Sequence, residues 1–268
     1  RRTDAEVPPP RRGTGFNENL AREILELHTV GIDGGYSQAD VTEFASALTG
    51  LGVAGPQDLD AATPVVFRQV AHEPGDRTVM GKRYTQAGKA QAGAILTDLA
   101  AKPETARFVC TKIARHFVAD NPSPRLVSAL ETAWIASGGD LARVAEALID
   151  APEAWRPEAA KFKTPYEFVV SSYRALGMQP RGLGQLAILT TLGQRSFAAP
   201  SPKGWPDEAG PWTGSDALVK RLQFAQAMAA AANVQDPNQL AVETLGARLS
   251  ASSATAIRRA ESRVEAVA

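Results

Sequence analysis

Apolar residues recur at helical spacing along most of this chain, and this periodicity limits the folds that the chain can adopt. From about Gln86 onward the pattern predicts helices over 87–101, 104–119, 123–137, 140–150, 216–231, 237–248 and 252–265. Ser37 is a natural N-cap with Asp40 three residues on, which predicts a helix that Gly50 and Gly52 end. Thr164, Pro165 and Glu167 have the form of a capping box with proline at the first helical position, which predicts a helix that ends near Gly177. The sequence therefore predicts an all-α protein with roughly ten helices.

One short segment departs from the helical pattern. Val65-Val66-Phe67-Arg68 and Thr78-Val79-Met80 are typical of strands, and His72-Glu73-Pro74-Gly75-Asp76 between them favours a turn. We predict one short two-stranded β element near 64–84 in which these two runs pair.

Composition along the chain suggests three segments. Residues 1–15 are polar and rich in Pro, Gly and Arg, which predicts a flexible segment. Residues 16–231 are expected to form one helical domain, and the Ala/Ser-rich residues 232–268 a helical tail that is loosely attached. A Pro/Gly-rich loop over 197–214 carries two tryptophans and is too apolar for a solvated linker.

The composition argues against several classes of protein. Lys plus Arg equals Asp plus Glu at 29 each, whereas nucleic-acid binders normally carry a basic excess. No apolar run approaches the roughly 20 residues that span a bilayer. No HExxH, CxxC, GxSxG, P-loop or dinucleotide motif is present, so the motifs identify no cofactor. Cys110 is expected to be a small buried hydrophobic residue, with a reactive thiol as the alternative.

The residues 17–31 carry the densest polar pattern in the chain. On a helix, Glu18, Arg22 and Glu26 lie one turn apart, with Glu23 beside them. One interpretation is an ion-pair and capping network that fixes this helix against the rest of the fold. The other makes Glu23 or Glu26 a catalytic general base or a metal ligand, with Arg22 stabilising an anion.

The turn at His72 is a second candidate. His72, Glu73 and Asp76 could bind a divalent cation or transfer protons, and Arg68 would point near them if the two predicted strands pair. The alternative is a turn that side-chain to backbone hydrogen bonds hold together. The metal content therefore stays open, with a divalent cation as one possibility.

Two further binding residues come from loops. Lys163 precedes a predicted helix N-terminus, where free N–H groups and its own charge could hold an anion, although capping already explains its neighbours. Trp205 and Trp212 could stack a sugar or another flat ligand on their indoles, or could plug the loop into the core.

Four separated blocks, in this order, resemble one bacterial family of helical proteins, the domain of unknown function 1800. They are Asn17-Glu18-Asn19 with Arg22-Glu23, Glu26-Leu27, Gly31, Gly35-Tyr36 and Ala47-Leu48-Thr49-Gly50; His72-Glu73-Pro74-Gly75 with Thr78, Met80 and Gly81; Lys163-Thr164-Pro165 with Glu167, Val169 and Arg174-Ala175-Leu176-Gly177; and Gly193-Gln194 with Pro200, Pro202, Gly204-Trp205-Pro206 and Trp212. The blocks cover roughly residues 16–230. Glu73 replaces the usual Asp and Leu51 a frequent Trp.

The resemblance implies a location and a partner but no mechanism. Members of this family are usually longer at the N-terminus, so the chain is expected to correspond to the C-terminal part of the family's usual length. They look largely extracytoplasmic (periplasmic or secreted) and are often encoded beside an exported sulfatase-like protein, which is the expected partner. The family has no settled activity, and the oligomeric state stays open.

Two functions remain. In the first, the chain is an uncharacterised extracytoplasmic binding or assembly partner of an exported protein. In the second, it is a hydrolase-like enzyme with a Glu/His/Arg site where helix 17–29, the His72 turn and the Trp205 loop converge. The binding role is favoured because no nucleophile–base pair is recognisable in the sequence.

Overall fold

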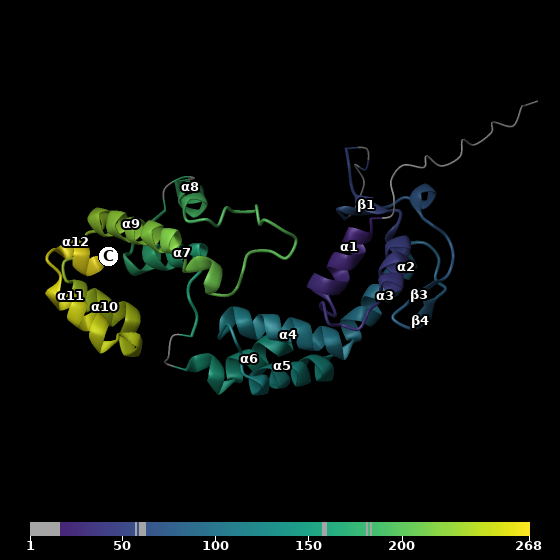
Figure 1. Cartoon of the computed structure of the whole chain (residues 1–268), viewed down its shortest axis with the longest axis horizontal. Coiled ribbons are helices and arrows are strands. Elements are labelled where there is room, and N and C mark those ends of the chain that lie inside the picture. Colours follow the sequence, from purple (N-terminus) through teal and green to yellow (C-terminus); the bar gives the residue numbers. More distant parts are fainter. Residues whose placement is uncertain (1–16, 57, 59–62, 157–159, 181, 183) are drawn as a thin grey trace, which may run out of the picture. The chain divides into compact units, whose positions relative to one another are not determined.

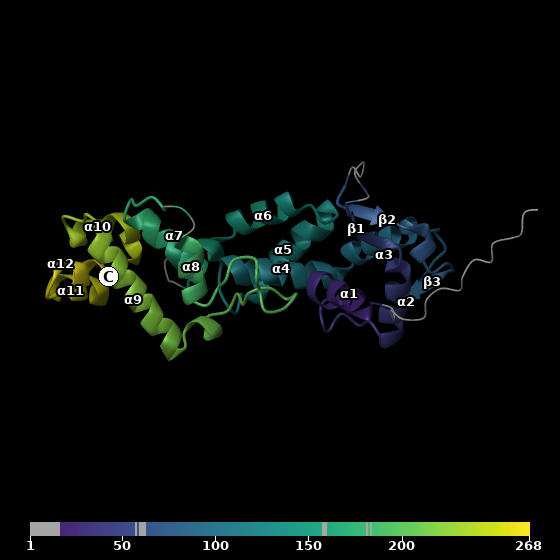
Figure 2. The same ribbon diagram turned by 90° about the horizontal axis from the view of Figure 1, so that it is seen from above.

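Helices dominate the structure, as the periodicity predicted. The computed structural model describes residues 17–56, 58, 63–156, 160–180, 182 and 184–268, so the predicted flexible segment 1–15 lies outside the described residues. The described residues form twelve α-helices and two two-stranded antiparallel sheets (Figures 1 and 2). The predicted mainly α-helical class with a small β element is confirmed.

The chain divides into two units, and each is described by itself. Unit 1 comprises Arg1–Val109 and Ala133–Asp140, and unit 2 comprises Cys110–Thr132 and Leu141–Ala268. The predicted division into 16–231 and a loosely attached tail 232–268 stays a prediction.

Unit 1 holds the first two sequence blocks. Its elements are α1 (Glu18–Glu23), a π-helical turn (Ile24–His28), α2 (Gln38–Leu48), β1 (Leu51–Val53), β2 (Val65–Phe67), a 3₁₀ turn (Gln69–Ala71), β3 (Arg77–Val79), β4 (Lys82–Tyr84), α3 (Lys89–Ala101), the first part of α4 (Pro103–Phe117) and the end of α5 (Pro124–Ser137).

Both predicted runs contain strands, but the predicted pairing between them is wrong. β2 pairs with β1, which follows Gly50, and β3 pairs with β4. Met80 and Gly81 join β3 to β4 with positive φ angles of 49° and 80°, the conformation of a tight hairpin turn. β3 pairs with the strand that follows it after a short turn, and β2 pairs with the strand that precedes it in the chain. β2 and β3 therefore belong to different sheets.

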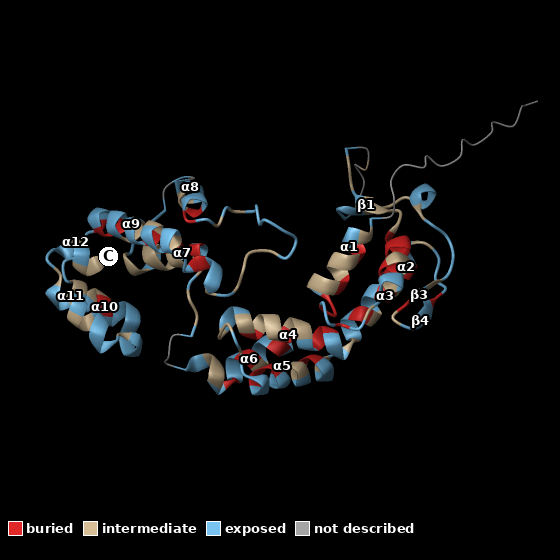
Figure 3. Ribbon diagram, viewed as in Figure 1, coloured by how far each residue is buried: buried red, intermediate tan, exposed pale blue. Residues whose placement is uncertain are grey.

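The core of unit 1 forms between α2, α1 and α3. Ser37 caps α2 in a capping box with Asp40, as the sequence predicted. Val41, Phe44 and Leu48 then lie on the buried face, and Figure 3 shows buried residues along α2. Leu25 and Ile95 pack into the same cluster from the π-helical turn and from α3.

Unit 2 holds the last two blocks. Besides the second part of α4 and the first part of α5, it contains α6 (Leu141–Asp150), α7 (Pro165–Ala175), α8 (Gly184–Thr191), α9 (Ser215–Ala231), α10 (Pro237–Leu245), α11 (Ala251–Arg259) and α12 (Arg263–Val267), with 3₁₀ turns at Pro152–Trp155, Gly210–Trp212 and Gly246–Arg248.

A small core in unit 2 joins α7 to α8. Val169 on α7 packs with Leu189 and Leu192, and Phe224 on α9 packs against this cluster. The helix α8 had no counterpart in the sequence prediction. In the C-terminal residues, Arg263 donates hydrogen bonds to the carbonyl oxygens of Ala232 and Val234 at 3.4 and 3.0 Å.

None of the helices in the described part of the chain combines the length and the apolar character that a membrane span requires.

Candidate functional site

The polar residues on α1 bond mainly to α2 and form no straight ladder. Arg22 donates to the side-chain oxygen of Gln38 at 2.6 Å and lies 3.5 Å from Glu26. Glu18 accepts hydrogen bonds from Gln38 at 2.9 Å and from Thr42 at 3.0 Å. These contacts link the two helices at their solvent-exposed edge.

The Glu26 carboxylate lies in a π-helical turn, a rare geometry that often occurs at functional sites. Tyr36 donates its hydroxyl to Glu26 at 2.5 Å. Burial and the adjacent Glu26 carboxylate raise the pKa of Tyr36, so the tyrosine stays a donor. The Thr29 hydroxyl donates to the Ile24 carbonyl at the end of this turn. Glu23 is half-buried and makes no hydrogen bond or ion pair with a described residue.

His72 is fixed at the end of α2. Its Nδ1 lies 2.9 Å from the carbonyl oxygen of Thr49 and 3.3 Å from the Thr49 hydroxyl, which itself accepts the N–H of Glu73. The His72 ring contacts Phe67 edge to face at 5.3 Å. A Cβ at Gly50, where φ is +83°, would lie 3.1 Å from the His72 Cβ, so glycine allows this close approach.

Arg68 lies four residues before His72 in the sequence. It forms an ion pair with Asp58 at 2.8 Å, and a Cβ at Gly52 would lie 2.9 Å from one of its guanidinium nitrogens. Asp76, in the turn, pairs with Arg83 at 2.5 Å. Contacts from Thr49 and Arg83 therefore hold residues of the turn in place.

The structure places Glu26 and His72 at opposite ends of one helix. Glu26 bonds to Tyr36, just before α2, and His72 bonds to Thr49, just after it. Because α2 has 11 residues, its ends are separated by about 16 Å. A carboxylate and an imidazole at that separation do not share one hydrogen-bonded shell.

The other predicted binding residues belong to unit 2. Lys163 donates to the Ser171 hydroxyl at 2.9 Å. Trp212 is buried and donates its indole N–H to the Pro206 carbonyl at 2.9 Å, and its ring lies 5.9 Å from that of Trp205. Trp212 therefore plugs its loop into the fold, while Trp205 is half-buried beside it.

A polar cluster that sequence reasoning missed anchors the tryptophan loop. Asp120, beyond the end of α4, accepts hydrogen bonds from the Lys161 ammonium at 2.6 Å and from the Ala209 N–H at 2.7 Å. Burial alone would raise the pKa of Asp120, but these donors lower it below its ordinary value. His116 contacts Asp207 at 2.7 Å in the same cluster.

The described residues give little support for a metal site or for a reactive thiol at Cys110. Within the described ranges, no group of three or more His, Cys, Asp and Glu side chains is arranged to hold a metal ion. Cys110 is fully buried, and burial raises its pKa to about 11, so its thiol stays protonated at neutral pH.

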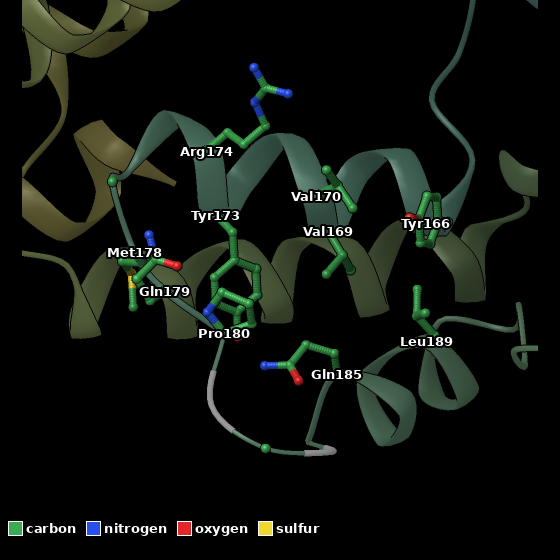
Figure 4. A pocket seen from close by; sticks show the side chains of 12 residues that line it. Tyr166, Val169, Val170, Tyr173, Arg174, Met178, Gln179, Pro180, Gln185 and Leu189 are labelled. Atoms are coloured by element: carbon green, nitrogen blue, oxygen red, sulfur yellow. The ribbon is translucent and has the colours of Figure 1, made fainter.

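A candidate site is a cavity between α7 and α8, with a volume of about 600 Å³ (Figure 4). This volume lies in the range of small-molecule and peptide-side-chain sites. Twelve described residues line it: Tyr166, Val169, Val170, Tyr173, Arg174, Gly177, Met178, Gln179, Pro180, Gly182, Gln185 and Leu189.

Figure 4 shows how the side chains are distributed along the cavity. Tyr166 and Leu189 lie at one end, Met178 and Gln179 lie at the other, and Tyr173, Pro180 and Gln185 lie between them. Arg174 projects outward at the rim and makes no ion pair with a described residue. Among the described lining residues, none is an Asp, Glu, His, Cys, Ser or Thr.

Two of the sequence blocks meet at the start of α7, where Tyr166 lines the cavity. Thr164 and Glu167 form the capping box that starts α7, as predicted. The N–H of Tyr166, in the first turn of α7, is taken by the side-chain oxygen of Gln194 at 2.7 Å. Gln194, 28 positions after Tyr166 in the sequence, thus fixes the N-terminus of α7. Both blocks are visible in the sequence, but no sequence pattern predicts that they contact each other.

Comparison with known proteins agrees with the resemblance in the sequence. The model of the family described as "Protein of unknown function (DUF1800)" matches residues 3–268. The match extends beyond the four blocks and includes the C-terminal helices. No curated protein and no solved structure matches the chain.

Proposed function

Because this chain belongs to the DUF1800 family of proteins of unknown function, we propose a role from its own geometry: a binding or assembly partner of an exported protein. The observation that carries the proposal is the lining of the α7–α8 cavity. Aromatic, aliphatic and amide groups provide contact surface and hydrogen bonds there, but no carboxylate or imidazole among the described lining residues can act as a general base.

An extended segment of a partner protein fits this lining. Tyr166 and Tyr173 offer flat surfaces with a hydroxyl, which suit partly apolar contacts. Gln179 supplies an amide that can pair with the backbone of a bound strand. Arg174 at the rim attracts a carboxylate. The bound segment is therefore apolar, with an acidic residue beside its apolar side chains.

The hydrolase alternative receives less support from the contacts. Glu26 is held by Tyr36 and Arg22, and His72 by Thr49. Because Glu26 and His72 lie at opposite ends of α2, these two predicted site residues do not act together on one substrate.

The location and the partner rest on the family. Its members look largely extracytoplasmic, and an exported sulfatase-like protein is the expected partner. We therefore place the function outside the cytoplasm, with that protein as the first candidate for binding.

The test measures the dissociation constant between this chain and the exported sulfatase-like protein by biolayer interferometry. Val170→Asp puts a charge into the cavity and is expected to weaken binding by about tenfold or more. Val219→Asp is the matched control, because Val219 is an exposed valine on α9 that does not line the cavity.

Two results would contradict the proposal. One is an absence of binding at concentrations of about 10 μM, where a specific complex should form. The other is an equal loss of affinity in both variants, with circular dichroism showing that both are folded. Hydrolysis of a chromogenic ester by the wild type that His72→Ala abolishes would support the alternative instead.

A further inference from the structure

A second cavity in unit 2 has a different chemical character. It measures about 610 Å³, and its described lining comes from the end of α4, the start of α5, residues 153–156 and 160–163, and the end of α10 with Arg248. Four described cations line it: Arg156, Lys161, Lys163 and Arg248. We call it the basic cavity. In a chain whose formal charge is zero, four cations around one cavity are a local excess.

Among the described residues, the carboxylates that line the basic cavity or pair with its cations do not cancel this excess. Glu153 is the one described carboxylate in the lining, and it already pairs with Arg125 at 3.2 Å. Lys161 is neutralised by Asp120 at 2.6 Å. The other three lining cations, Arg156, Lys163 and Arg248, form no ion pair with a described carboxylate.

Two of those cations have no partner in the part of the chain that the structure describes. Arg156 and Arg248 are exposed and make no hydrogen bond or ion pair there. Lys163 donates only to the neutral Ser171 hydroxyl. Charged groups that lack a partner bind an anion without first breaking an ion pair.

The start of α5 adds to the positive potential. α5 has 14 residues, and Ser123, which precedes the helix, and Leu126 in its first turn line the cavity. Ser123 caps the helix by accepting the Leu126 N–H at 3.2 Å, but the first turn of any α-helix leaves further N–H groups unpaired. This helix end supports the cations and does not form a site alone.

The rest of the lining is apolar. Phe117 is exposed beside the cavity, and Pro122, Leu126 and Leu245 contribute further apolar surface. A ligand therefore needs an anionic group for the three cations and an apolar or ring-shaped body for these walls. We propose that the basic cavity binds a small organic anion that carries a phosphate or sulfate ester. This proposal is independent of the α7–α8 cavity.

The probes are phenyl phosphate and phenyl sulfate, with phenol as the neutral comparison, and binding to the full chain is measured by isothermal titration calorimetry. The double variant Arg156→Gln/Arg248→Gln is expected to weaken binding of the better ester by about tenfold or more, because it removes two charged hydrogen-bond donors. Arg259→Gln is the matched control: Arg259 is an exposed arginine on α11, outside the cavity, and its loss should change affinity by less than about twofold. The better of the two esters identifies the anion.

Salt provides a second measurement on the wild type, which does not depend on how a variant folds. Raising KCl from about 50 to 300 mM should weaken binding of the ester and leave phenol unaffected. The proposal is overturned if neither ester binds at about 1 mM, if phenol binds as tightly as the esters, or if the control loses as much affinity as the double variant.

Discussion

At the scale of single residues, Arg221 is the clearest case of a side chain whose role sequence could not reveal. It lies on α9, is buried, and donates to the Lys163 carbonyl at 2.8 Å. Its guanidinium carbon lies 4.6 Å from the ring centre of Phe162 and 5.2 Å from that of Phe168. Burial lowers the pKa of Arg221, so its charge opposes folding while its contacts favour it.

Removing this side chain should therefore cost more than removing its charge. We expect Arg221→Ala to lower the free energy of unfolding by about 2–3 kcal/mol, because it removes a side chain that is itself buried, leaves the Lys163 carbonyl without its charged donor and leaves two aromatic rings without a contact. Arg221→Met keeps much of the packing and should cost about 1 kcal/mol. Urea unfolding of both variants checks the order, and a larger loss in the methionine variant would contradict it.

His72 allows a test of the two interpretations of its turn. If the imidazole fixes the turn, His72→Ala removes its contacts with Thr49 and Phe67 and lowers the free energy of unfolding by about 1–2 kcal/mol. The metal content of the purified protein, measured by mass spectrometry, should be the same in wild type and variant. A fall in bound metal without a loss of stability would instead favour a ligand role for His72.

At the scale of elements, Asp40 connects the start of α2 to the β3–β4 hairpin. Its carboxylate accepts the N–H and the hydroxyl of Ser37, both at 2.7 Å, and the N–H of Met80 at 2.6 Å. Met80 has a positive φ of 49°, an unusual conformation for a residue other than glycine. The hydrogen bond to Asp40 thus holds the hairpin turn in place.

These contacts predict how stability depends on pH. Burial alone would raise the pKa of Asp40, but the hydrogen bonds from Ser37 and Met80 lower it below its ordinary value. A lowered pKa in the folded state gives stability that is present above the unfolded pKa of about 4 and is lost as pH falls through the folded value. Asp40→Asn should therefore cost about 1 kcal/mol at pH 7 and less at pH 2.

The control for Asp40 is Asp33→Asn, because Asp33 is exposed and makes no hydrogen bond or ion pair with a described residue. It should change stability by less than about 0.5 kcal/mol at either pH. Chemical denaturation at pH 7 and pH 2 measures both variants. A cost for Asp40→Asn that is equal at the two pH values would contradict the role of its charge.

Local signals explain which elements could be predicted from the sequence. The capping boxes at Ser37 and Thr164 each combine a cap, a third-position carboxylate and an apolar period, so both helices start where the sequence placed them. α8 lacks a comparable cap and a clear apolar stripe, and it was missed. The strand pairing depended on the Met80–Gly81 turn, whose first residue gives no sequence signal of a positive φ.

The candidate site was harder to predict, because it depends on contacts between distant residues. The blocks around Thr164 and Gln194 were both recognised as family markers, but only the structure brings Gln194 to the N-terminus of α7. Polar residues drew attention in the sequence, and the α7–α8 cavity is lined mainly by tyrosine, valine and amide side chains. In a sequence, tyrosine, valine and amide residues at helical spacing are equally typical of a buried helix face, so they do not indicate a cavity.

At the scale of the whole molecule, equal numbers of acidic and basic residues argue against nucleic acid as a ligand. Affinity for DNA comes largely from many phosphate contacts along the duplex, with a steep dependence on salt. The basic cavity offers four cations at one place, one of them already paired with Asp120. Such an arrangement suits one small anion better than a long, regularly charged polymer.

The two kinds of ligand can be compared directly in one experiment. A fluorescent DNA duplex of about 30 base pairs should show no change in anisotropy with this chain at about 150 mM salt, because a chain without a basic excess releases few counterions. Phenyl phosphate should bind under the same conditions. If the duplex binds and competes with phenyl phosphate, and Arg156→Gln/Arg248→Gln weakens both, then the cavity is part of a nucleic-acid surface and the argument from net charge fails.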